Sequence, residues 1–150
     1  MITPPRRNYL SWNNYFMEIA ELSAERSKDP NRQVGACIVN DENRIIGIGY
    51  NGMPNGCPDH KFSWKKGGKG LDNKNLYVCH AEVNAILNSN NTTRDCSLYS
   101  TKFPCNECTK VIIQSGIKKI FYKTIRKNRI ITKASKKMLR SSKVKIQKLK

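Results

Sequence analysis

Apolar residues recur at helical spacing in the segment that follows the first ten residues. These positions are Trp12, Tyr15, Phe16, Ile19, Ala20 and Leu22. Ser11 is a residue type that caps helix starts, and the proline in Lys28-Asp29-Pro30-Asn31 is typical of a helix end. The pattern therefore predicts a helix from residue 11 to about residue 27.

Two short apolar runs come next, and a polar turn separates them. Residues 35–39 are apolar throughout and predict a buried strand, while residues 44–50 predict a second strand. Residues 40–43 are polar, so the two strands are expected to form a hairpin. Residues 51–76 are rich in Gly, Pro, Asn and Lys and predict a long loop, which in a compact domain is usually functional or disordered.

The rest of the chain alternates between helical and strand-like patterns. The expected elements are a helix from His80, a strand at 97–100, a helix over 105–114 with Gly116 as C-cap, a strand at 118–122, a helix around 130–138 and an exposed strand at 144–146. This order indicates a layered α/β domain with a mixed sheet. Because no internal repeat or boundary interrupts the 150 residues, we expect one domain, 1–150.

The charge of the chain is concentrated near its C-terminus. The formal net charge is +17, from 28 basic and 11 acidic residues, and residues 118–150 contribute 14 basic residues and no acidic one. Positive charge attracts phosphates, so nucleotides and nucleic acids are the first partners to consider. No apolar stretch reaches the roughly 18–20 residues of a membrane span, and the N-terminus lacks the apolar stretch of a signal peptide. These features predict a cytoplasmic protein without a membrane partner.

Six cysteines fall into three pairs by their surroundings. Cys37 and Cys96 lie in apolar or strand-like runs and are interpreted as buried thiols, and Cys57 and Cys79 are given structural roles. Without an export signal a reducing compartment is expected, where clustered cysteines more often bind metal than form disulfides. The clustered pair is Cys105-Asn106-Glu107-Cys108.

Two short motifs carry recognisable chemistry. His80-Ala81-Glu82 and Pro104-Cys105-Asn106-Glu107-Cys108 together match the H-x-E and P-C-x-x-C signature of zinc deaminases. Cys105 and Cys108 stand three apart at a helix start, so their sulfurs share one face where the helix dipole favours thiolates. With His80 they supply three ligands to one Zn²⁺, and the fourth tetrahedral position stays open for water, as in catalytic sites.

Glu82 has a defined role beside such a metal. A bound Zn²⁺ lowers the pKa of water towards ~7. A carboxylate next to that water can accept its proton and pass it to the nucleotide base, which then loses its amino group as ammonia. Glu82 is therefore the expected catalytic residue.

The sequence resembles the deoxycytidylate (dCMP) deaminases of the eukaryotic and phage-related type. The segments that carry this resemblance are 15–17, 26–30, 33–39, 47–54, 77–82 and 103–108. The resemblance implies a three-layer α/β/α fold with a central mixed five-stranded sheet, and hydrolysis of dCMP to dUMP and ammonia, which supplies dUMP for dTMP synthesis. It also implies a homohexamer that dCTP activates and dTTP inhibits, usually with Mg²⁺.

Four further residues are expected to contact the substrate. Arg26 and Lys28, near the end of the first predicted helix, could bind the 5′-phosphate, since guanidinium contacts phosphate bidentately. Asn51, at an Asn-Gly turn, could bond the sugar or the base, or could simply form the turn. Ala81, between the two functional residues of the H-x-E motif, completes the set.

The resemblance weakens after Tyr122, in the divergent and strongly basic residues 123–150. Family members commonly place an aromatic residue there, whereas here none follows Tyr122; Arg126 either stacks in its place or belongs to a solvated loop. Two alternatives stay open for this reason. One is a deaminase acting on RNA or single-stranded DNA, and the other is a catalytically weakened relative that binds nucleotides.

Overall fold

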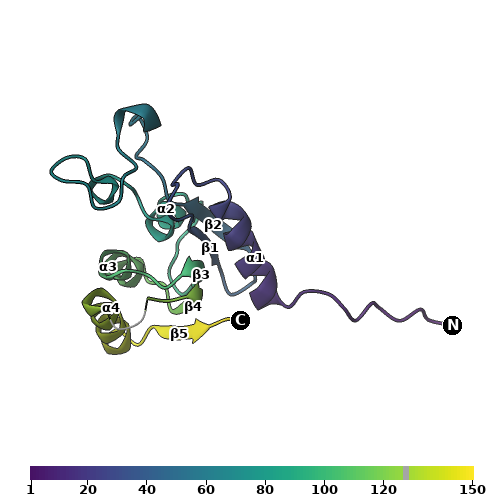
Figure 1. Cartoon of the computed structure of the whole chain (residues 1–150). Helices are drawn as coiled ribbons and strands as arrows, with labels where there is room; N and C mark the ends of the chain where they lie inside the picture. The colour runs from purple at the N-terminus through teal and green to yellow at the C-terminus, as the bar shows by residue number, and fades with distance from the viewer. Residues whose placement is uncertain (127–128) are drawn as a thin grey trace.

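The computed structural model describes residues 1–126 and 129–150. Within these residues, four α-helices flank a five-stranded sheet, and residues 1–10 extend away from it (Figure 1). The helices and strands, in chain order, are α1 (Trp12–Ala24), β1 (Gly35–Val39), β2 (Ile45–Tyr50), α2 (Ala81–Leu87), β3 (Ser97–Lys102), α3 (Asn106–Gln114), β4 (Lys119–Thr124), α4 (Ile130–Ser141) and β5 (Lys145–Lys148).

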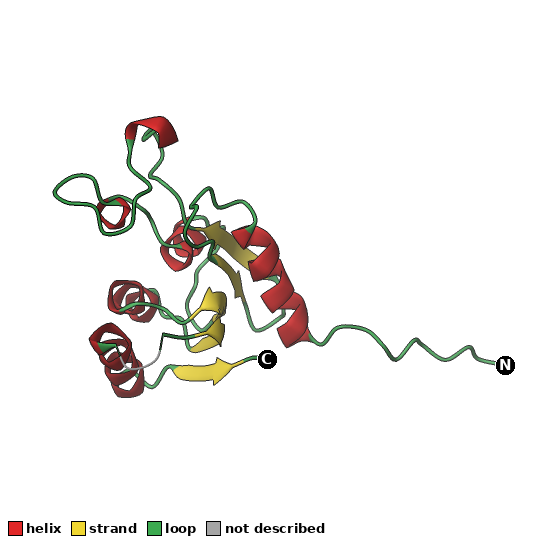
Figure 2. Ribbon diagram, viewed as in Figure 1, coloured by secondary structure: helices red, strands yellow, loops and turns green. Residues whose placement is uncertain are grey.

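The sheet is mixed, as the sequence predicts. Its strands lie in the order β2-β1-β3-β4-β5. β1 runs antiparallel to both β2 and β3, which confirms the hairpin, whereas β3, β4 and β5 run parallel to one another. Parallel neighbours need a crossover connection, and α3 and α4 provide the two that are required (Figure 2).

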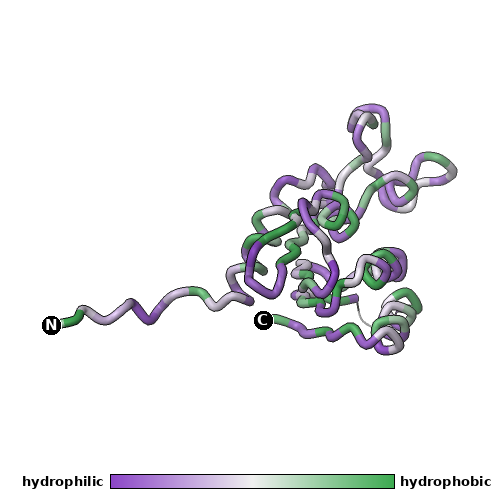
Figure 3. Tube along the Cα trace, turned by 180° about the vertical axis from the view of Figure 1, so that it is seen from behind, coloured by the Kyte–Doolittle hydropathy of each residue, from purple (hydrophilic) through white to green (hydrophobic). Residues whose placement is uncertain are grey.

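Each face of the sheet has its own apolar cluster. Under α1, the packed side chains are Phe16, Met17, Ala20, Cys37, Val39, Tyr99 and Phe121. On the other face, α2, α3 and α4 pack Ala85, Ile112 and Leu139 against strand residues that include Ile38. The expected three-layer α/β/α fold is thus confirmed. Hydrophobic and hydrophilic stretches alternate along the chain trace in Figure 3.

Two glycines allow helices to lie unusually close to the sheet. A Cβ atom on Gly35 would stand 1.8 Å from the carbonyl oxygen of Ala20 in α1. A Cβ atom on Gly49 would stand 2.3 Å from the backbone nitrogen of Ala85 in α2. Both contacts are shorter than any real Cβ contact, so glycine at these positions sets how near α1 and α2 approach β1 and β2.

Some boundaries differ from the sequence expectation. Ser11 caps α1 as predicted, since its Oγ accepts a hydrogen bond from the N–H of Asn14, but α1 ends at Ala24 and not near residue 27. Cys105 caps α3 and is not its first residue. The predicted loop 51–76 contains two short 3₁₀ turns, Asp59–Lys61 and Lys74–Leu76. The hydrophobic pattern does not predict them, because turns of three residues are too short to show a period.

Other expectations are confirmed. Cys37 and Cys96 are buried, and all four residues of β5 are exposed. The C-cap of α3 is Ser115 and not Gly116, which follows it with φ 82°. In the part of the chain that is described, no helix has both the length and the apolar character needed to cross a bilayer.

Candidate active site

The predicted metal ligands meet where two helices begin. His80 is the N-cap of α2, and Cys105 is the N-cap of α3. The Sγ of Cys105 accepts a hydrogen bond from the N–H of Cys108 at 3.4 Å, so the cysteine motif also caps its own helix. Because helix N-termini carry partial positive charge, this arrangement stabilises a thiolate at Cys105.

The three ligand atoms have the spacing of a tetrahedral metal site. The Nδ1 of His80 lies 3.2 Å from the Sγ of Cys108 and 3.4 Å from the Sγ of Cys105. All three atoms lie within 4.8 Å of one another. Zinc bonds of about 2.0–2.3 Å to nitrogen and sulfur require ligand atoms roughly 3.5 Å apart. The residues therefore fit Zn²⁺ in both chemistry and spacing.

Protons are shared unequally within this cluster. The pKa of Cys105 is lowered to about 3, chiefly because Cys108 donates a hydrogen bond to it, with a further contribution from His80. The same hydrogen bond, together with burial, raises the pKa of Cys108. The hydrogen bond to Cys105 also raises the pKa of His80. Zinc binding needs both cysteines as thiolates and an unprotonated Nδ1 on His80, so the metal competes with protons for these three atoms.

Glu82 is a buried carboxyl group directly beside the cluster. Glu82 lies in the first turn of α2, and the residue is only 4% exposed. Oε1 accepts a hydrogen bond from the Ser100 hydroxyl at 3.4 Å, and Oε2 lies 3.7 Å from the Sγ of Cys108. Burial raises the pKa of Glu82 above its usual range. A carboxyl group with a raised pKa beside a metal-ligand cluster is suited to taking up and giving back a proton.

Three cations influence one another near this cluster. Burial, followed by the positive charges of Arg126 and Arg32, lowers the pKa of Lys102 to about 8. The charge of Lys102 in turn acts on His80. We name Arg32, Lys102 and Arg126 the rim cations. Arg126 stands out in the sequence because it occupies the place of an aromatic residue, whereas the sequence patterns do not predict Arg32 and Lys102. The position of Lys102, two residues before Pro104 of the cysteine motif, is the one signal that points to it.

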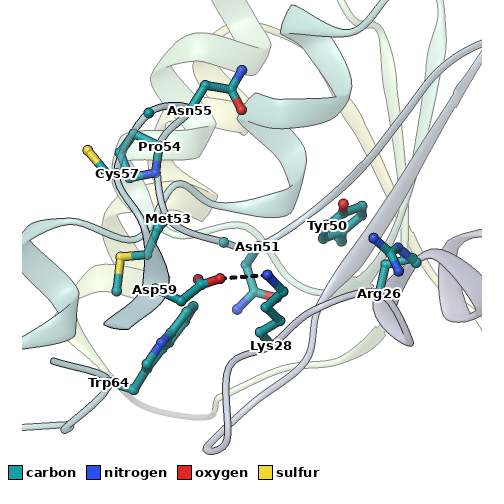
Figure 4. A pocket seen from close by; sticks show the side chains of 12 residues that line it. Arg26, Lys28, Tyr50, Asn51, Met53, Pro54, Asn55, Cys57, Asp59 and Trp64 are labelled. Carbon is teal, nitrogen blue, oxygen red and sulfur yellow. Dashed lines mark hydrogen bonds and ion pairs between the residues drawn. The ribbon is translucent and has the colours of Figure 1, made fainter. Parts of the chain in front are cut away.

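Arg26 and Lys28 lie in a separate pocket, which is shown in Figure 4. Lys28 pairs there with Asp59, with 2.6 Å between Nζ and Oδ2. The guanidinium carbon of Arg26 stands 5.9 Å from the centre of the Tyr50 ring. The described lining of this pocket includes Asn51, Met53 and Trp64, but no residue of the metal-ligand cluster and not Glu82. The structure thus brings Arg26, Lys28 and Asn51 together in one pocket, whose described lining includes none of the metal ligands.

The amide of Asn51 is occupied by backbone and side-chain partners. Its Oδ1 accepts from the N–H of Val34 at 2.8 Å, and its Nδ2 donates to the carbonyl of Arg32 at 2.9 Å and to Asp29 at 3.3 Å. Both hydrogens of Nδ2 are used in these bonds, while Oδ1 has a second lone pair, so the contact of Asn51 with substrate stays a prediction. The same holds for Ala81, which is fully buried at the start of α2, where backbone N–H groups have no acceptor within the helix.

Comparison with protein families gives a match over most of the chain. Residues 10–124 match the family described as the cytidine and deoxycytidylate deaminase zinc-binding region. A deoxycytidylate deaminase from Pongo abelii is 61% identical over 119 residues, which cover 78% of this chain and 67% of that protein. The deoxycytidylate deaminase of Homo sapiens is 60% identical over the same length and the same shares.

Solved structures give a similar result. The dCMP deaminase from the cyanophage S-TIM5, in complex with dCMP and dUMP, superposes with a TM-score of 0.74 at 29% sequence identity. The superposition covers 90% of this chain and 94% of the phage chain. The structural likeness therefore extends beyond residue 124, where the family match ends.

Proposed function

The chain belongs to the cytidine and deoxycytidylate deaminase family, and from this membership we propose that it hydrolyses dCMP to dUMP and ammonia. One observation carries the proposal: a carboxyl group that is buried and has a raised pKa, Glu82, lies against three residues that fit zinc, in a chain about 60% identical to deoxycytidylate deaminases. Its product, dUMP, would supply dTMP synthesis.

The proposed chemistry needs a metal and a proton carrier. Zinc, when held by His80, Cys105 and Cys108, supplies a Lewis acid that lowers the pKa of water towards ~7. Glu82 accepts a proton from the attacking water and delivers it to N3 of the cytosine ring. A second proton passes through Glu82 to the departing amino group, so dCMP and water are converted to dUMP and ammonia. Glu82 lies in the first turn of the short helix α2, two residues after His80. The helix therefore keeps the carboxyl group of Glu82 close to the metal-ligand cluster.

The 5′-phosphate of dCMP requires cationic partners, and two groups of cations are candidates. Arg26 and Lys28 line the pocket of Figure 4, and Lys28 would have to leave Asp59 to bind a phosphate. The rim cations act electrostatically on the metal-ligand cluster through Lys102. Asn51 holds the carbonyl of Arg32, so it would position a rim cation even without touching the substrate itself.

Further properties are proposed from the family resemblance. We propose one domain, 1–150, a cytoplasmic location and assembly as a homohexamer. We also propose that dCTP activates and dTTP inhibits the enzyme, with Mg²⁺ accompanying the effector. Cations and aromatic rings in the pocket of Figure 4, such as Arg26, Tyr50 and Trp64, would suit a second nucleotide.

A substrate panel tests the proposed function. The purified zinc-loaded chain is offered dCMP, deoxycytidine, CMP, single-stranded DNA and tRNA, and ammonia release is measured for each. We expect turnover of dCMP that far exceeds that of the other four. Deamination of tRNA or single-stranded DNA without turnover of dCMP would support a polynucleotide deaminase instead. Binding of dCMP without any turnover would support a catalytically weakened relative.

A further inference from the structure

The outer side of α4 presents a row of cations. Lys133, Lys137 and Arg140 stand at i, i+4 and i+7 and are all exposed, so they lie on one side of the helix about 5–6 Å apart. Lys136 is different, because its side chain is half-buried with Nζ 6.0 Å from the centre of the Phe103 ring. We name Lys133, Lys137 and Arg140 the α4 row.

The edge strand β5 extends this positive surface. Its two lysines, Lys145 and Lys148, are exposed. In the parallel register Lys148 stands beside Tyr122, whose side chain belongs to the cluster on the face covered by α4. Side chains alternate along a strand, so Lys148 points to the α4 side of the sheet, whereas Lys145, which stands beside Lys119, points to the opposite side and does not belong to this surface. α4 and β5 lie side by side in Figure 1 and together form the surface that we name the α4–β5 face.

Acidic groups do not neutralise this face. Residues 118–150 contain 14 basic side chains and no acidic one. Among the described residues, no cation of α4 or β5 forms an ion pair, and the one cation of the segment that does is Lys123, with Glu21. Glu107, the nearest preceding acid in the sequence, pairs with Lys110 at 2.6 Å. The face therefore carries a positive charge that a polyanion can neutralise.

We propose that the α4–β5 face binds the phosphate backbone of double-stranded nucleic acid without reading its sequence. Interfaces with nucleic acid are polar and strongly positive, and Lys and Arg that neutralise phosphates supply most of their sequence-independent affinity. Neither α4 nor β5 contains a metal ligand, Glu82 or a rim cation, so this binding is separate from deamination. The nucleic acid is a docking partner and not a substrate.

Other occupants fit this face less well. Single strands are held largely by stacking on aromatic rings, and residues 123–150 contain no aromatic residue. Protein interfaces are depleted in lysine and enriched in aromatic residues at their centre. Membrane-surface helices insert a continuous apolar face, whereas α4 exposes large apolar side chains only in its first turn, at Ile130 and Ile131, and buries Leu139 inside the protein.

The test compares two triple variants of the full chain. In the first, the α4 row is replaced, K133Q/K137Q/R140Q; in the second, three exposed lysines of the long loop are replaced, K65Q/K66Q/K69Q. Both lose the same charge, and glutamine preserves helix propensity in α4. Binding to a labelled 30-bp DNA duplex of arbitrary sequence is measured by fluorescence anisotropy at several salt concentrations. Thermal unfolding and dCMP turnover verify that each variant is folded.

We expect the α4-row variant to lose about 10-fold or more in duplex affinity near 0.1 M salt, and its salt dependence to be shallower by roughly 0.9 for each phosphate contact removed. The loop variant should change affinity less than about twofold, and dCMP turnover should be unchanged in both. Equal losses in the two variants would mean that only net charge matters and would overturn the proposal. So would absence of duplex binding by the unaltered chain, stronger binding to oligo-dT than to duplex, or a preference for phosphatidylserine vesicles.

Discussion

The carboxylate of Asp29 and the ammonium of Lys74 form a buried ion pair between segments 45 residues apart in the chain. Their side chains are only 2% and 8% exposed. Asp29 also accepts hydrogen bonds from the backbone N–H groups of Asn31 and Arg32 and from the Asn51 side chain. Burial alone would raise the pKa of Asp29, but the bonds from Lys74 and from the two N–H groups outweigh it and lower the pKa.

Lys74 of this ion pair begins the short segment that leads to His80. The carbonyl of Lys74 accepts hydrogen bonds from the N–H groups of Tyr77 and Val78. Cys79 then pairs with Gly52 through two backbone hydrogen bonds of 2.8 and 3.1 Å. Lys74 and the residue after Asn51 thus hold the backbone of the three residues that precede His80, the first metal ligand.

Replacing Lys74 with methionine should destabilise the protein strongly. The change keeps most of the side-chain volume but leaves the carboxylate of Asp29 buried without its partner, which typically costs about 3–5 kcal/mol. The free energy of unfolding is measured by urea denaturation at pH 7. The matched control is Lys28→Met, which breaks the exposed pair with Asp59 and should cost less than about 1 kcal/mol. Equal costs for the two changes would contradict a special role for the buried pair.

Removing one sulfur ligand should remove the metal. The zinc-loaded chain should contain about one Zn²⁺, and Cys105→Ala should lose it because two protein ligands hold zinc far less tightly than three. Metal content after dialysis is measured by atomic absorption. Cys57→Ala is the control, since Cys57 lies outside the metal-ligand cluster and should leave the zinc content unchanged. Full zinc occupancy in Cys105→Ala would show that the ligand assignment is wrong.

Glu82→Gln should separate catalysis from metal binding. Glutamine preserves the shape of the side chain but cannot carry the proton, so kcat for dCMP should fall by about 10²–10⁴ while zinc content stays near one per chain. Steady-state ammonia release and metal analysis measure the two effects. Glu107→Gln makes the same change at a glutamate whose side chain is 69% exposed, and it should retain full activity. Retained activity in Glu82→Gln would exclude Glu82 as the proton carrier.

The charge of Lys102 should make substrate affinity depend on pH. Burial and the neighbouring cations Arg126 and Arg32 lower its pKa to about 8, so the side chain is charged below pH 8 and loses its charge above it. If the rim cations hold the 5′-phosphate, KM for dCMP should rise above pH 8. Lys102→Arg keeps its charge throughout this range and should flatten the rise. If KM depends on pH in the same way in Lys102→Arg and in the unaltered chain, Lys102 does not hold the phosphate. Arg26 and Lys28 would then be the candidates, and their replacement by alanine should raise KM.

The metal site could be predicted from the sequence because its geometry is local. Cys105 and Cys108 are three residues apart at a helix start, and His80 and Glu82 belong to one short turn, so secondary structure alone brings each pair together. The same local reasoning predicts the hairpin and the alternating helices and strands, since hydrophobic periodicity reports which side of an element is buried.

The tertiary structure decided which distant residues become neighbours. Only the packing of α2 and α3 against the sheet brings the Nδ1 of His80 within 3.4 Å of both sulfurs. Lys74 meets Asp29 across a loop without hydrophobic periodicity, and the amide of Asn51 bonds the segment around Asp29, through Arg32 and Val34. Such contacts depend on which buried polar groups become hydrogen-bond partners once the chain is folded. The spacing of residues along the sequence carries no information on that pairing.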